Sequence, residues 1–140
     1  MDTRRPRLVP ELDVSDLDTS LAFYGVLGFS VLYTRTEERF ACLELDGVKL
    51  MIEEAGGPGR RFRTAALAYP FGRGVHFQIE VFHVDRVLER ATTAGHAPLI
   101  PMEERWYKTA HGLVGNRQFL VAVPDGYLLR FFRDLGTRQD

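Results

Sequence analysis

The chain has 140 residues, of which 45% are hydrophobic and 26% charged, a composition typical of one globular domain rather than a disordered chain. Its formal net charge of −1 offers no basic field to a phosphate backbone, so we expect no nucleic-acid partner. No apolar stretch approaches the ~20 residues that span a membrane, and the single cysteine, Cys42, excludes an intrachain disulfide. We therefore expect a cytoplasmic protein with no membrane partner.

The first half of the chain predicts one strand, one helix and three further strands. Residues 8–14 alternate in polarity, as a half-buried strand does. The following helix is predicted to start behind Asp16 and to end at Gly28, because a stripe of apolar residues at spacings of four and three lies between them. β-rich segments complete this half at 29–35, 39–45 and 48–54.

The second half repeats that order after a connecting segment, residues 55–73, which is rich in Gly, Pro and Arg. This segment lacks the Lys-Ser/Thr pair of a phosphate-binding loop, so we interpret it as a linker or a lid. A helix is predicted between Asp85 and Gly95. Strands are predicted at 75–81, 99–106, 114–123 and 127–132.

An offset of 67 residues carries Val14 to Val81 and Gly28 to Gly95, which indicates two copies of one unit. The sequence thus predicts a single α+β domain over residues 1–140, built from two βαβββ modules. The predicted boundaries are 8–54 for the first module, 55–73 for the linker and 74–133 for the second module.

Alternation along the strands separates two faces. One face is almost wholly apolar and is predicted to pack against the helices. The other mixes apolar residues with polar ones such as Glu53, His76 and Arg130. A concave surface with an apolar floor and a few polar groups is typical of a ligand pocket, whereas an ordinary open sheet face with scattered charges is the alternative.

Three stretches of the chain resemble the vicinal oxygen chelate superfamily, which contains glyoxalases, bleomycin resistance proteins and dioxygenases. They are Val9-Pro-Glu-Leu-Asp-Val-Ser-Asp, then Ser20-Leu-Ala-Phe-Tyr with Leu27-Gly-Phe, and Asn116-Arg-Gln-Phe-Leu-Val-Ala-Val-Pro-Asp-Gly-Tyr-Leu-Leu-Arg-Phe. The resemblance covers residues 8 to 133 and is best for the bleomycin resistance branch. It implies that the two modules form cup-shaped mixed sheets and that the protein is a homodimer.

Enzymes of this superfamily hold a divalent metal in the cup with His, Glu and similar ligands on four strands. The resemblance places Val9, Glu53, His76 and Arg130 at those positions. Valine cannot ligate a metal, and arginine is a permanent cation. We therefore predict that the metal site is lost, that no cofactor is needed, and that Glu53 pairs with Arg130.

The resemblance predicts a metal-free binding protein of the bleomycin-resistance type, which sequesters an antibiotic-like or aromatic small molecule in a groove between two subunits. Trp106 and Tyr107 would suit stacking on such a ligand. Two alternatives remain open: a metal-dependent lyase, epimerase or dioxygenase with Glu11 or Glu44 as substitute ligands, and a protein-interaction or regulatory module. The sequence leaves the ligand unidentified. The predicted ligand-binding residues are Phe40, Glu53, His76, Trp106, Tyr107, Gln118 and Arg130.

Overall fold

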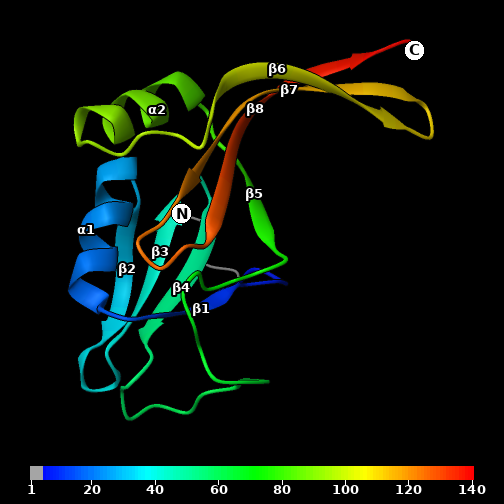
Figure 1. Ribbon diagram of the computed structural model, residues 1–140. Helices are drawn as coiled ribbons and strands as arrows, with labels where there is room; N and C mark the ends of the chain where they lie inside the picture. The colour runs from blue at the N-terminus through cyan, green and yellow to red at the C-terminus, as the bar shows by residue number, and fades with distance from the viewer. Residues whose placement is uncertain (1–4) are drawn as a thin grey trace.

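The computed structural model describes residues 5–140, in which two helices lie beside two four-stranded sheets (Figure 1). None of the helices in this part of the chain is long and apolar enough to cross a membrane. In chain order the elements are β1 (Glu11–Val14), α1 (Leu17–Leu27), β2 (Ser30–Arg35), the 3-10 turn η1 (Thr36–Glu38), β3 (Phe40–Leu45), β4 (Val48–Glu54), β5 (His76–Glu80), α2 (Val84–Thr93), β6 (Ile100–Thr109), β7 (Gly112–Ala122) and β8 (Leu128–Arg138).

Both sheets have the same topology. Their strand orders are β1-β4-β3-β2 and β5-β8-β7-β6. In each sheet the first strand pairs in parallel with the last strand of its module, and the other pairs are antiparallel. The chain therefore folds as an α+β structure of two βαβββ modules, as the sequence repeat predicted.

Local signals in the sequence fix the ends of α1. The side chain of Asp16 accepts a hydrogen bond from the Asp18 N–H at 3.1 Å, which caps the start of the helix. Gly28 ends the helix with a φ of 115°, a left-handed conformation that a glycine adopts without the steric cost of a Cβ atom. In the second module, Gly95 takes the equivalent place with a φ of 89°.

The predicted apolar faces form the core. Leu43 and Ile52 in the first sheet and Leu129 and Phe131 in the second are all buried against the helix layer. The two modules share this core, because the rings of Phe29 and Phe131 approach to 6.5 Å between centroids. Because these apolar side chains are buried on one face of each sheet, the opposite, mixed face of each sheet is left available for a ligand.

Two equivalent hydrogen bonds tie the modules together. The Asp46 carboxylate, in the turn between β3 and β4, accepts the N–H of Phe82 at 2.8 Å. The Asp125 carboxylate, in the turn between β7 and β8, accepts the N–H of Ser15 at 2.9 Å. Ser15 and Phe82 are related by the same offset of 67 residues as the rest of the repeat. Each module thus caps the end of the other module's first strand.

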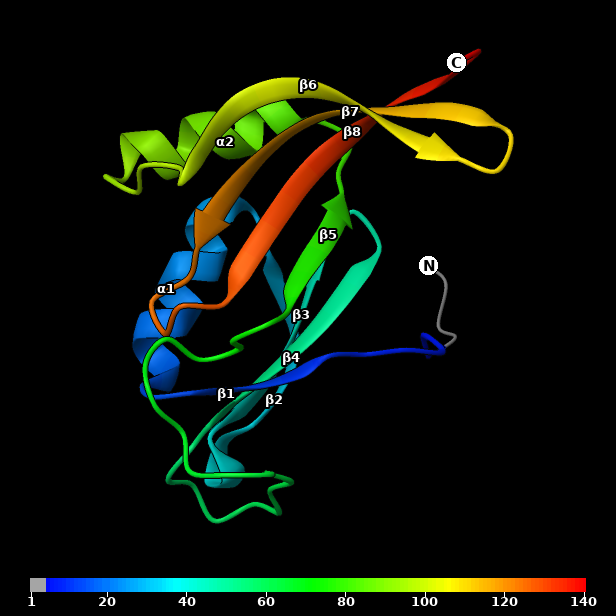
Figure 2. The ribbon, with the colours of Figure 1, turned by 45° about the vertical axis from the view of Figure 1, so that its right-hand side comes forward.

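The main departures from the predicted strands lie at the chain's two ends. β1 begins at Glu11 rather than at residue 8, and β8 continues to Arg138 rather than ending at residue 132. The ends of β6, β7 and β8 together form an arm that projects from the rest of the molecule (Figures 1 and 2). Residues 133–138 lack apolar alternation, so the sequence pattern carried no signal for this extension.

Candidate functional site

The mixed face of each sheet contains a cavity. The cavity on the second sheet measures about 240 Å³, and that on the first sheet about 540 Å³. Because strand side chains alternate, both cavities open on the side away from the helices.

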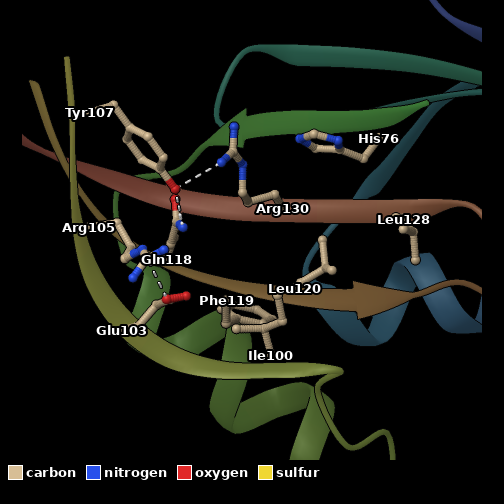
Figure 3. A pocket seen from close by; sticks show the side chains of 10 residues that line it. All are labelled: His76, Ile100, Glu103, Arg105, Tyr107, Gln118, Phe119, Leu120, Leu128 and Arg130. Atoms are coloured by element: carbon tan, nitrogen blue, oxygen red, sulfur yellow. Dashed lines mark hydrogen bonds and ion pairs between the residues drawn. The ribbon is translucent and has the colours of Figure 1, made fainter. Parts of the chain in front are cut away.

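The cavity on the second sheet has a polar end and an apolar end (Figure 3). Its apolar wall comes from Ile100, Leu120 and Leu128, whose side chains project from β6, β7 and β8. Its polar side chains are His76, Glu103, Arg105, Tyr107, Gln118 and Arg130. Such a combination orients a small organic molecule while its apolar part is removed from water.

A hydrogen-bond network organises the polar end. The Tyr107 hydroxyl accepts bonds from Gln118 Nε2 at 2.6 Å and from Arg130 Nη1 at 3.1 Å. The buried amide of Gln118 is held in turn by Asn116 Nδ2, which donates to Gln118 Oε1 at 3.3 Å. Three neighbouring strands therefore fix the position of the Arg130 guanidinium.

Arg130 carries a charge without a counter-ion in the part of the chain that the structure describes. Its Nε atom is buried and has no hydrogen-bond partner there. The nearby carboxylate of Glu103 instead lies 3.8 Å from Arg105 Nε. A partly desolvated cation is costly unless an anion approaches it, so this end of the cavity favours a negatively charged group.

The cavity on the first sheet is lined mainly by aliphatic and aromatic groups. Its apolar lining includes Val9, Leu32, Tyr33 and Met51, and its charged lining residues are Arg5, Glu11 and Lys49. Cys42 also lines this cavity, although the residue is buried.

Glu53 lies on the same sheet and is bound by the linker. Arg61 Nη1 lies 3.1 Å from Glu53 Oε2, and Arg61 Nε lies 3.6 Å from Asp13 Oδ1. Arg61 also donates to the carbonyl oxygen of Glu54 at 2.7 Å. The predicted pairing of Glu53 with Arg130 is therefore wrong within the chain, because the linker guanidinium occupies this carboxylate. Burial raises the pKa of Glu53, the neighbouring carboxylate of Asp13 raises it further, and Arg61 opposes the shift.

The structure gathers four of the seven predicted ligand-binding residues in the second-sheet cavity. These are His76, Tyr107, Gln118 and Arg130. Glu103 and Arg105 also line it and were missed, although their alternation with Tyr107 along β6 places all three on one face.

Phe40 and Trp106 do not line either of these two cavities. Phe40 is buried, with the Arg35 guanidinium 3.7 Å from its ring centroid. The side chain of Trp106 lies on the opposite face of β6 from that of Tyr107, because adjacent residues in a strand point in opposite directions. There it lies against Gly115, where a Cβ atom would come within 2.7 Å of the indole ring, so only glycine leaves room for it.

The four positions at which the resemblance expects metal ligands do not suit a metal here. Val9 has no donor atom, Arg130 is cationic, and Glu53 is already paired with Arg61. Within residues 5–140, no three side chains from His, Cys, Asp and Glu are grouped closely enough to hold a metal ion. Only His76 remains as a candidate ligand among the four.

No family model and no curated protein matches this chain. Among solved structures, TioX from Micromonospora sp. ML1 is 25% identical, with a TM-score of 0.73 over 94% of this chain and 100% of its own. A bleomycin resistance determinant encoded on transposon Tn5 is 18% identical, with a TM-score of 0.61 over 94% of this chain and 99% of its own.

A superfamily member from Vibrio splendidus 12B01 is 35% identical over 91% of this chain and 97% of its own, with a TM-score of 0.43. Together with the repeated βαβββ modules, the likeness to TioX and to the bleomycin resistance determinant shows that the chain has the glyoxalase/bleomycin resistance fold.

Proposed function

We propose that this protein is a metal-free binding protein of the bleomycin-resistance type, which sequesters an aromatic or antibiotic-like small molecule. The observation that carries the proposal is the state of Glu53. This residue stands where enzymes of the superfamily supply a metal ligand, and here its carboxylate contacts Arg61 at 3.1 Å. A guanidinium on this carboxylate does locally what a metal cation would do, since it balances the charge.

The composition of the two cavities supports a role in binding. Ile100, Leu120 and Leu128 offer apolar surface, and Tyr107 and Gln118 offer oriented polar atoms. Affinity in such a site comes from apolar area removed from water and from a few hydrogen bonds, and no reacting group is required.

A homodimer would complete the site. The second-sheet cavity of about 240 Å³ is smaller than the roughly 300–1,000 Å³ that small-molecule pockets usually offer. β2 exposes apolar side chains beside the first-sheet cavity, with Val31 50%, Leu32 41% and Tyr33 44% exposed. In the proposed dimer, this face of one subunit covers the second-sheet cavity of its partner, which joins the two cavities into one groove.

A thermal-shift screen tests the proposal. The purified protein is heated with bleomycin, with aromatic antibiotics, with divalent metals and with a chelator. We expect a rise in melting temperature with at least one organic ligand, because a molecule that binds only the native state stabilises it. We expect no change with the chelator. A fall in melting temperature on chelation, accompanied by stoichiometric bound nickel, zinc or iron, would favour a metal-dependent lyase, epimerase or dioxygenase instead.

The dimer is tested by a charge on β2. Leu32→Glu places a carboxylate in the proposed interface, whereas Glu37→Gln on the neighbouring turn η1 serves as the control. Sedimentation equilibrium should give a dimer for the unmodified protein and the control, and a monomer for Leu32→Glu. A monomeric unmodified protein that still binds a ligand tightly would contradict the shared groove.

A further inference from the structure

The polar end of the second-sheet cavity carries more positive than negative charge. Arg105 and Arg130 line it together with one carboxylate, that of Glu103. Glu103 lies 3.8 Å from Arg105, and no carboxylate of residues 5–140 forms an ion pair with Arg130. The guanidinium of Arg130 is therefore the group in this cavity whose charge is left uncompensated.

Tyr107 adds a hydrogen-bond donor beside that charge. A phenolic oxygen accepts two hydrogen bonds and donates one. Gln118 and Arg130 already donate to this oxygen, at 2.6 Å and 3.1 Å. The hydroxyl proton of Tyr107 is thus not used by Gln118 or Arg130 and is free for an acceptor in the cavity, and Figure 3 shows the Tyr107 oxygen beside the Arg130 guanidinium.

The apolar wall lies at the other end of the same cavity. In the strand register, Leu120 on β7 pairs with Arg130, and Leu128 on β8 pairs with His76. Ile100 on β6 closes this end of the cavity. A molecule that fills the cavity would place an apolar body on these side chains and its polar group against Arg130 and Tyr107.

From this arrangement we infer that the ligand is an organic anion, a flat apolar molecule that bears a carboxylate held by Arg130 and Tyr107. The inference rests on the proposed binding function and adds the charge of the ligand to it. A guanidinium with unused N–H groups and an adjacent hydroxyl matches the two oxygens of a carboxylate, and hydrogen bonds between charged groups are stronger than neutral ones. A cationic ligand would meet the uncompensated charge of Arg130 and is disfavoured at this end.

Three probes of the same shape and different charge separate this inference from the general binding function. Naphthalene-2-carboxylate is the anion, naphthalene-2-carboxamide the neutral analogue, and 2-naphthylmethylamine the cation. Their affinities are measured by ligand-observed NMR at low and at high salt. We expect the carboxylate to bind about tenfold more tightly than the carboxamide at low salt, with a smaller ratio at high salt.

Two variants assign the effect to Arg130. Arg130→Met keeps the length of the side chain without its charge, and it should reduce the ratio of carboxylate to carboxamide affinity to about one. Its melting temperature without ligand should stay the same or rise, because an unpaired charge is removed. The control is Arg117→Met, on the opposite face of β7, where Arg117 pairs with Asp85 at 2.6 Å. This control should keep the preference for the carboxylate.

The outcomes distinguish the two proposals. Equal affinities of the carboxylate and the carboxamide for the unmodified protein would overturn the anion assignment and leave the binding function standing. A carboxylate preference that persists in Arg130→Met would overturn the role of Arg130. If none of the three probes binds, the second-sheet cavity is not a ligand site, and both the binding function proposed for it and the anion assignment are wrong.

Discussion

Replacement of Arg61 by methionine tests how the linker stabilises the first sheet. The Arg61 side chain is 9% exposed, and it contacts the carboxylates of Glu53 and Asp13, each 14% exposed. Arg61→Met would leave two partly buried carboxylates facing each other without their shared cation. Removal of one partner of a fully buried ion pair costs about 3–5 kcal/mol, and for this slightly exposed group we expect about 2–3 kcal/mol.

Urea denaturation followed by circular dichroism measures this loss, and the melting temperature should fall by roughly 6–12 °C. The matched control is Arg63→Met. Arg63 also pairs with Asp13, at 3.1 Å, but its side chain is 30% exposed, so its loss should cost clearly less. In a second control, Glu53→Gln added to Arg61→Met should restore part of the stability, because it removes the uncompensated charge.

The pH dependence of Arg61→Met gives an independent check. Burial already raises the pKa of Glu53 above its usual value, and loss of Arg61 should raise it further. A carboxyl group whose pKa is raised in the folded state destabilises the folded protein at pH values above that raised pKa. At pH values below the pKa that the group has in the unfolded chain, it has no such effect. The difference in unfolding free energy between the variant and the unmodified protein should therefore shrink as the pH falls from 7 towards 4. If Arg61→Met costs no more than Arg63→Met, or if its cost is independent of pH, this reasoning is refuted.

Three further predictions concern the core, a helix terminus and the cavity. Leu129→Ala should lower the unfolding free energy by about 3 kcal/mol in urea denaturation, because Leu129 is 0% exposed and leaves a hole in the shared core. The Glu54 carboxylate accepts a hydrogen bond from the Leu17 N–H at 3.0 Å, and this bond lowers the pKa of Glu54. The stability that the bond supplies should therefore be lost as the pH falls through the folded-state pKa of Glu54. Glu54→Gln should flatten this part of a plot of melting temperature against pH. Tyr107→Phe removes the acceptor of Gln118 Nε2, and calorimetry should show a loss of about 1 kcal/mol in stability, whereas an unchanged protein would show that water replaces the hydroxyl.

The repeated fold could be predicted because its signals are local. Asp16 and Gly28 mark the two ends of α1 by their chemistry alone, and alternation along β4 and β8 separates the buried face from the mixed one. The same alternation is the reason that Gln118 and Arg130, from two different strands, were expected on one face and line one cavity.

The contacts of the site were harder to predict because they join segments without a pattern. Arg61 lies in the irregular linker, so nothing in the sequence revealed that it would reach Glu53 before Arg130 could. The position of Trp106 was predictable in principle, since a strand cannot turn two consecutive side chains towards one ligand. The guanidinium of Arg35 packs over the buried ring of Phe40, a contact that only the three-dimensional structure reveals.

Calorimetric titration of the purified protein with nickel, zinc and manganese tests the central claim most directly. Because Arg61 holds Glu53 and the other three positions supply only His76 as a donor, we predict no saturable uptake of any of the three metals at micromolar concentration. Uptake of one metal ion per chain, abolished by Glu53→Ala and by His76→Ala, would contradict the claim that this protein binds its ligand without a metal.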